Sequence, residues 1–115
     1  MYLNLMILWV IMILIYITCK DKAEAKKISK QLLEKRLIAC ANIFPIESMY
    51  RWKDKIKEDN EIVLLAKTNK KHYEEIEKEV KKIHSYEIPC IIKIKAKANQ
   101  EYYDWIEKET SNCNI

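Results

Sequence analysis

The sequence predicts an α+β fold in which strands and helices alternate around one core. Short runs rich in β-branched residues are separated by two longer runs with the 3.6-residue period of amphipathic helices. A length of 115 residues suits one domain with a modest core. The chain contains no glycine and only two prolines, so other residues must form its turns.

The N-terminal part of the chain is uncharged as far as Cys19, although charged residues make up 33% of the whole. Residues 13–17 are β-branched or aromatic apart from one leucine, which is typical of a buried central strand. The alternative is a membrane anchor, because the nineteen uncharged and mostly apolar residues 1–19 reach the length of a membrane span. A signal peptide is disfavoured, since no Lys or Arg precedes the run and no small-residue cleavage site follows it. We expect a strand over residues 12–18, an apolar extension over residues 1–11, and no membrane association.

The first helix is expected from Asp21 to about Leu37. Asp21, with Glu24 three residues later, is typical of a capping box at a helix start. Apolar side chains recur after it at helical spacing, at Ala25, Ile28, Leu32 and Leu33.

A pair of strands follows this helix. Residues 38–44 form an apolar run that we expect to be interrupted at Pro45, because proline is confined to edges and bulges of sheets. Strand character resumes over residues 48–52. Asp54 is expected to reverse the chain in a left-handed conformation, and residues 61–68 form the return strand.

The second half of the chain repeats the pattern. A helix begins near Thr68 or Asn69, both good N-cap residues, and residues 99–106 form a short final helix. The apolar face of the first of these helices consists of Tyr73, Ile76, Val80 and Ile83. Between the helices, a strand runs through Ile92, Ile94 and Ala96, with Lys93, Lys95 and Lys97 pointing outward. The element order predicts a ferredoxin-like split βαβ sandwich over residues 12–110, with a tail over residues 111–115.

The most informative connection is residues 84–89. It places the imidazole of His84, the phenol of Tyr86 and the carboxylate of Glu87 just before a proline. Three kinds of polar side chain crowded into a connection indicate a site more than a plain turn. The alternative is a helix C-terminus that carries a histidine favoured by the helix dipole.

Composition argues against two functions. Charges alternate in sign through residues 53–61 and 70–82, whereas a nucleic-acid interface would show a basic stripe with exposed aromatics. The four cysteines are not paired as C-x-x-C, so a structural zinc site is not expected, and nothing demands an oxidising compartment.

Six stretches stand in order with few gaps: residues 13–37, 37–45, 49–56, 61–68, 84–89 and 101–106. Together they resemble the CutA family, the divalent-cation tolerance proteins, over about residues 12–110. The resemblance implies a long β-hairpin, a homotrimer, and an association with copper and other divalent metals without catalysis. We expect a cytoplasmic protein with no obligatory cofactor. The chain departs from the family where Ile46 and Asp54 replace glycines and where Ser85 replaces a proline, which we expect to loosen the positioning of His84.

The resemblance also implies a metal site. His84 and Cys40 match family positions linked with metal, and imidazole and thiolate are ligands that suit copper. Two ligands do not close a site, so His84 would bind alone or with a thiol brought close by trimer packing. The alternatives are a buried core thiol for Cys40 and a partly exposed, helix-ending imidazole for His84. His72 is expected to face solvent.

A second cluster would lie between subunits in the resembling family: Tyr50, Trp52, Glu61, Lys67, Tyr86 and Glu87. An aromatic pocket with a paired cation and carboxylates suits a small anion or an amino-acid-like ligand. The alternative is interface packing, because aromatic residues are enriched at interfaces.

Three function classes therefore compete. The first is a trimeric, metal-responsive protein without catalysis, and the second is a small-molecule-sensing trimer that resembles the PII signalling proteins. The third is an enzyme such as an acylphosphatase, which is disfavoured because the chain has no glycine-rich anion loop and only two arginines, Arg36 and Arg51.

Overall fold

The structure is a computed structural model that describes residues 11–111. Its elements, in chain order, are β1 (Ile11–Cys19), α2 (Lys22–Glu34), β2 (Cys40–Trp52), β3 (Lys55–Thr68), the 3-10 helix η1 (Lys70–His72), α3 (Tyr73–Ile83), β4 (Ile91–Lys97) and α4 (Gln100–Glu109). Ile11, assigned to the extension, begins β1; the rest of that extension and residues 112–115 of the predicted tail lie outside the described residues. No helix among residues 11–111 is both long and apolar enough to cross a membrane.

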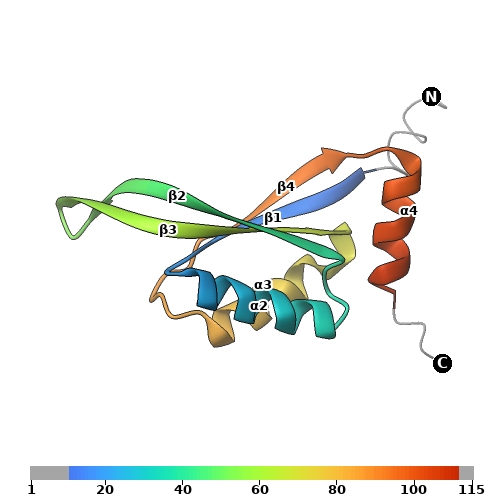
Figure 1. Ribbon diagram of the computed structural model, residues 1–115, viewed down its shortest axis with the longest axis horizontal. Coiled ribbons are helices and arrows are strands. Elements are labelled where there is room, and N and C mark those ends of the chain that lie inside the picture. Colours follow the sequence, from blue (N-terminus) through green and yellow to red (C-terminus); the bar gives the residue numbers. More distant parts are fainter. Residues whose placement is uncertain (1–10, 112–115) are drawn as a thin grey trace.

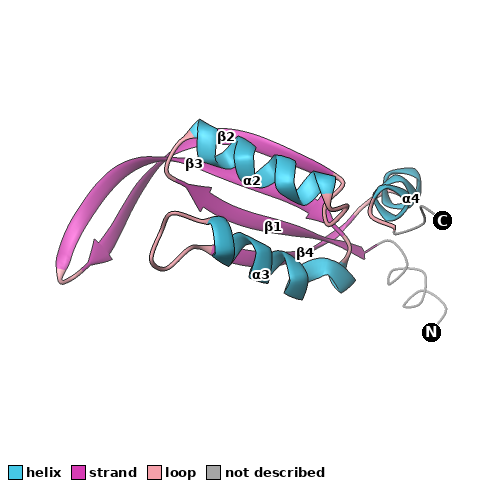
Figure 2. Cartoon of the chain, turned by 90° about the horizontal axis from the view of Figure 1, so that it is seen from below, coloured by secondary structure: helices cyan, strands magenta, loops and turns pink. Residues whose placement is uncertain are grey.

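The four strands form one antiparallel sheet in the order β2-β3-β1-β4. Helices α2 and α3 lie side by side on one face of this sheet, and α4 stands at one end of it (Figures 1 and 2). The ferredoxin-like sandwich is therefore confirmed, with β1 as a central strand, as its uncharged, β-branched sequence predicts.

The core lies between the sheet and the two helices. Its fully buried side chains include Ile13, Ile15, Ile17, Ile28, Leu32, Leu64, Ile76 and Val80. Burial of one such side chain stabilises the fold by about 1.5–3 kcal/mol relative to exposure. Alternate residues of β1 supply the sheet side of this core, so the even-numbered residues of β1 point to the face without helices.

Helix α2 begins as predicted but ends earlier. The Asp21 carboxylate accepts a hydrogen bond from the Glu24 N–H at 2.8 Å, which confirms Asp21 as the N-cap. The helix stops at Glu34 because Arg36 takes a left-handed conformation (φ 57°) and the Leu37 N–H donates back to the Leu32 carbonyl at 3.0 Å. This is the usual glycine-terminated helix end, formed here without glycine.

Strands β2 and β3 form a long hairpin that projects beyond the rest of the subunit (Figures 1 and 2). The predicted interruption at Pro45 is wrong, because β2 runs through it. β2 is an edge strand, where a residue without an N–H is tolerated. At the tip, Lys53 (φ 51°) and Asp54 (φ 65°) are both left-handed, as a two-residue hairpin turn requires. The left-handed conformation predicted for Asp54 is confirmed, and that of Lys53 was not predicted.

Strand β4 is present, but its side chains point to the opposite faces of the sheet from those predicted. Lys93 and Lys95 pair with buried residues of β1 and share their face, toward the helices. The Lys93 ammonium lies 5.1 Å from the centroid of the Tyr73 ring, at the start of α3. Ile92 and Ile94 instead lie on the face without helices, 48% and 41% exposed. An apolar sheet face is thus left open in the single chain.

The end of α4 is fixed against η1. His72, expected to face solvent, is half-buried, and its Nε2 lies 2.9 Å from the carbonyl oxygen of Thr110, the C-cap of α4. His72 is therefore a structural contact between two elements.

Candidate functional site

His84 ends helix α3. Its backbone is extended (φ −76°, ψ 141°), and its N–H donates to the Val80 carbonyl at 2.9 Å. The side chain folds back against the end of β1 and is completely buried. The expectation of a partly exposed imidazole is therefore wrong, because the ring packs inside the connection that it closes.

Both nitrogen atoms of the His84 ring have partners. Nε2 lies 2.8 Å from the carbonyl oxygen of Thr18, to which it donates, and Nδ1 accepts the Tyr86 N–H at 3.1 Å. This pairing assigns a neutral imidazole with its proton on Nε2. A metal ion that bound either nitrogen would displace one of these hydrogen bonds.

A buried carboxylate completes this connection. Glu24 accepts the Lys20 N–H at 2.9 Å with one oxygen and the Ser85 N–H at 2.8 Å with the other. Burial acts to raise the pKa of Glu24, but these hydrogen bonds outweigh it and hold the pKa below its ordinary value. The serine that replaces the family's proline supplies an N–H that proline lacks. His84 is thus held in place by this bond instead of by a proline ring.

One group of three metal-ligating side chains occurs among residues 11–111: Cys19, Glu24 and His84, whose donor atoms lie within 4.8 Å of one another. Burial, followed by the charge of Glu24, raises the pKa of the Cys19 thiol to about 12, so this thiol is protonated at neutral pH. Sequence reasoning missed Cys19 because nothing in the spacing brings position 19 to position 84. The packing of the 84–86 connection against the end of β1 does so.

Cys40 lies elsewhere in the subunit. It pairs with Lys67 near the far end of β3, whereas His84 contacts Thr18, which pairs with Val63. Cys40 is also half-buried on the open face of the sheet and is not a fully buried core thiol. One subunit does not bring Cys40 and His84 together, so a joint site stays a prediction about the assembly.

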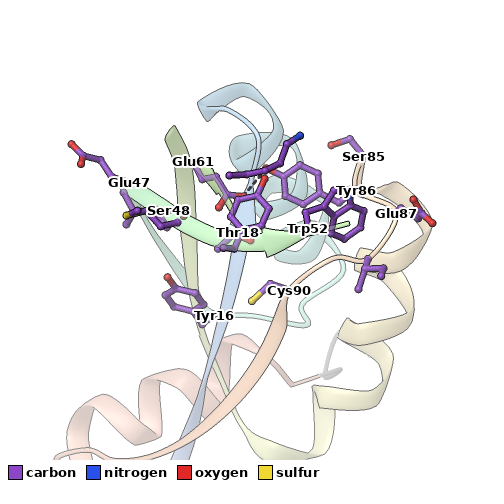
Figure 3. A pocket seen from close by; sticks show the side chains of 15 residues that line it. Tyr16, Thr18, Glu47, Ser48, Trp52, Glu61, Ser85, Tyr86, Glu87 and Cys90 are labelled. Atoms are coloured by element: carbon purple, nitrogen blue, oxygen red, sulfur yellow. Dashed lines mark hydrogen bonds between the residues drawn. The ribbon is translucent and has the colours of Figure 1, made fainter. Parts of the chain in front are cut away.

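A cleft of about 800 Å³ opens beside this connection (Figure 3). Five of the six predicted cleft residues line it: Tyr50, Trp52, Glu61, Tyr86 and Glu87. The hairpin forms one wall and residues 85–88 form the other. The floor consists of Tyr16, Thr18 and Cys90, which sequence reasoning missed. Tyr16 and Thr18 could have been found from the alternation along β1, because their even-numbered positions point to the face of the sheet opposite the core.

Lys67, the sixth predicted residue, does not line this cleft. Its ammonium lies 3.4 Å from the Tyr102 hydroxyl and 5.4 Å from the centroid of that ring. Within one chain, Lys67 is therefore not the cation that faces the carboxylates of the cleft, because β3 carries it toward α4.

Hydrogen bonds hold the polar groups of the cleft. The Tyr86 hydroxyl donates to Glu61 at 2.7 Å, and the Tyr50 hydroxyl donates to Asp59. Burial and the bond to Glu61 raise the pKa of Tyr86, the bond to Asp59 raises that of Tyr50, and burial raises that of Cys90. All three groups are protonated at neutral pH and are suited to hydrogen bonding.

Residues 13–109 match the family model of the CutA1 divalent ion tolerance protein. The chain belongs to the CutA family. Among its CutA relatives, the divalent-cation tolerance protein of Archaeoglobus fulgidus is 48% identical over 80 residues, 70% of this chain and 78% of the relative. The human protein CutA is 38% identical over 80 residues, 69% of this chain and 45% of the relative.

Solved CutA structures share the fold. The A. fulgidus protein, described as a periplasmic divalent cation tolerance protein, superimposes with a TM-score of 0.85 at 42% identity, covering 87% of this chain and 99% of its own. CutA1 from Oryza sativa gives a TM-score of 0.85 at 32% identity, with 90% of this chain and 96% of its own covered.

Proposed function

We propose that this CutA protein is a homotrimer that acts in divalent-cation tolerance by binding copper or another divalent ion, without catalysis. The observation that carries the metal-binding part is the close grouping of Cys19, Glu24 and His84, which offer sulfur, oxygen and nitrogen donors within 4.8 Å of one another. Thiolate and imidazole are donors that favour copper. Among residues 11–111, these three side chains would bind such an ion jointly.

The donor set fits copper in kind, but binding has a cost. The ion must displace the proton of Cys19, whose pKa is about 12, and one hydrogen bond of His84. Binding is therefore coupled to proton release, and affinity should rise as the pH rises.

Titration of the purified protein with Cu²⁺ against a competing chelator tests this proposal. His84→Ala should weaken binding at least tenfold, or about 1.4 kcal/mol. His72→Ala, which removes the other histidine, should leave affinity unchanged. Cys19→Ser should weaken binding if the site lies within one subunit, whereas Cys40→Ser should do so if trimer packing supplies the thiol. Equal affinity of the wild type and His84→Ala would contradict the proposal and leave His84 as a residue that ends a helix.

The open face of the sheet supports the trimer. Phe44, Ile92 and Ile94 are 38%, 48% and 41% exposed on the face without helices, and β2 and β4 are edge strands. A closed ring of subunits would bury this apolar surface and protect the edges. We expect each such interface to bury more than roughly 2,000 Å² in total.

A second candidate function is favoured by the cleft. The gathering of five predicted residues in one cavity supports a small-molecule-sensing trimer similar to the PII proteins. In that case Lys67 would reach a cleft only from a neighbouring copy, since its own subunit holds it against Tyr102.

The cytoplasm is the compartment that we propose for this protein. Cys19, Cys40 and Cys90 are free thiols, as is usual in a reducing compartment. The A. fulgidus relative is described as periplasmic, so cell fractionation is the test that separates the two locations.

A further inference from the structure

The net charge of the chain is concentrated in one segment. Residues 20–36 carry seven basic and three acidic side chains, a balance of +4 that equals the formal charge of the whole chain. The rest of the chain therefore has as many basic as acidic side chains. Most of the segment is helix α2, so the basic excess of the protein lies on one element of the fold.

Two of the three acidic residues in this segment are engaged by backbone groups. The Asp21 carboxylate caps α2, and the buried Glu24 accepts hydrogen bonds from the Lys20 and Ser85 N–H groups. Glu34, at the end of α2, is the third and is exposed. The segment therefore does not neutralise its own lysines.

The lysines of α2 form an unpaired row. Four exposed lysines have no carboxylate partner among residues 11–111: Lys22, Lys26, Lys27 and Lys30. Three of them are spaced four residues apart, so they follow one another along the helix at intervals of about 6 Å. On α3, by contrast, Lys81 lies 3.1 Å from Glu77 and Lys82 lies 3.7 Å from Glu79. Like charges at this spacing destabilise a helix, and an anionic partner would remove that cost.

This lysine row lies outside the proposed assembly. Helices α2 and α3 lie side by side on one face of the sheet (Figure 2). The proposed ring of subunits buries the other face, through Phe44, Ile92 and Ile94. The outer surface of α2 is therefore exposed in the single chain and in the trimer alike.

The shape and composition of the helix layer distinguish between anionic partners. Helix α2 does not stand alone but lies beside α3, so it is not placed to enter the major groove of duplex DNA, which is about 12 Å wide (Figure 2). No aromatic residue occurs on α2 for unpaired bases to stack on. Its large apolar side chains are buried in the core apart from Leu33, so the helix is not free to insert into a bilayer. The contact that remains is between unpaired lysines and a broad anionic surface.

We infer that the lysine row of α2 binds this protein to the surface of a membrane rich in anionic phospholipids. A lysine carries a compact charge on a flexible stem and contacts phosphate groups without a fixed geometry. Each lysine close to such a surface strengthens binding about fivefold. The inference goes beyond the proposed functions and depends on neither of them. It differs from the expected absence of membrane association, which was drawn from the N-terminal run and not from α2.

Sedimentation of the full chain with lipid vesicles tests this inference. Vesicles of phosphatidylcholine that contain about one third phosphatidylglycerol should bind the protein in about 0.05 M salt and release most of it in about 0.5 M salt, because salt screens exposed charges. Vesicles of phosphatidylcholine alone should not bind it. Lys26→Glu/Lys30→Glu should weaken binding to the anionic vesicles about thirtyfold or more.

Lys70→Glu/Lys71→Glu is the matched control. It changes the net charge of the chain by the same amount, at two exposed positions on η1 instead of α2. Acidic side chains are favourable at a helix start, so the fold should be kept. This variant should retain most of the affinity for anionic vesicles. Circular dichroism and the solution mass of both variants show whether the fold and the assembly are intact.

Four results would overturn the inference. Binding to neutral vesicles, or binding that persists at high salt, would assign the association to the apolar N-terminal residues of the sequence instead of to α2. Equal losses in the two double variants would show that net charge, and not the lysine row, controls binding. The absence of binding to anionic vesicles would contradict it directly. Binding to duplex DNA in preference to vesicles would replace the membrane with a nucleic acid. None of these results would alter the copper titration, which tests the metal-binding function separately.

Discussion

At the scale of single residues, the connection after α3 is held by hydrogen bonds from three elements. Glu24 at the start of α2 binds the Ser85 N–H, and His84 binds Thr18 at the end of β1. The loosening expected from the replacement of proline by Ser85 is offset by the bond that serine makes possible. The histidine that stood out in the sequence is therefore, first of all, a structural residue.

Restoring the proline tests this interpretation. Ser85→Pro removes the N–H that Glu24 accepts, and a hydrogen bond to a charged group contributes about 1.5–3 kcal/mol. The lower entropy of the unfolded chain returns only about 0.4–1 kcal/mol. The free energy of unfolding should fall by about 1–2 kcal/mol in urea denaturation at fixed protein concentration.

Ser85→Ala is the matched control, because it keeps the N–H and should leave stability nearly unchanged. A Ser85→Pro variant at least as stable as the wild type would show that the bond to Glu24 contributes little.

At the scale of elements, Glu79 joins the two helices. Its carboxylate lies 3.0 Å from the Lys35 ammonium just beyond α2, 3.4 Å from Gln31 and 3.7 Å from Lys82. The hydrogen bond from Lys35 is the main reason that the pKa of Glu79 lies below its ordinary value of 4.5.

This lowered pKa predicts how stability depends on pH. A carboxyl group whose pKa is lower in the folded state stabilises the fold fully above its unfolded pKa. The contribution is lost as the pH falls from about 4.5 through the folded pKa. Glu79→Gln should therefore be less stable than the wild type at neutral pH, and the difference should shrink steadily below about pH 4.5.

Urea denaturation at several pH values measures the difference. Glu75→Gln, on an exposed position of the same helix, is the control and should show little pH-dependent difference from the wild type. A constant gap between the wild type and Glu79→Gln across this range would contradict the assignment.

Much of the architecture could be predicted because local patterns agree with the tertiary fold. The uncharged run of β1 and the spacing of Ile76 and Val80 on α3 each have one low-energy placement. The errors have a common cause. Pro45 was expected to interrupt its strand, and Lys93 was expected to point away from the core. Both lie on edge strands, where proline is tolerated and a lysine can lie beside a helix, and strand order is not visible in local sequence.

The candidate site was predictable only in part, for the same reason. Tyr50, Trp52 and Tyr86 could be grouped through the family resemblance, and the structure gathers them in one cleft. The neighbours of His84 could not be anticipated, because Cys19 and Glu24 meet it through the packing of distant segments.

At the scale of the whole molecule, one face of the sheet has no helix of residues 11–111 packed against it. Two helices cover one face of the sheet, and the other face exposes apolar residues from β2 and β4 (Figure 2). The projecting hairpin adds Met49 and Ile56, which are 70% and 66% exposed. A surface of this kind is costly for a monomer and supports the proposed association with further copies of the chain.

The most direct test of this account is the solution mass by light scattering at micromolar concentration. We predict three times the 13.8 kDa of one chain. Ile94→Lys, on the open face of the sheet, should dissociate the assembly. Leu33→Lys should not, although Leu33 on α2 is equally exposed at 41%. A wild-type protein with the mass of one chain, or an Ile94→Lys variant that keeps the wild-type mass, would contradict the account.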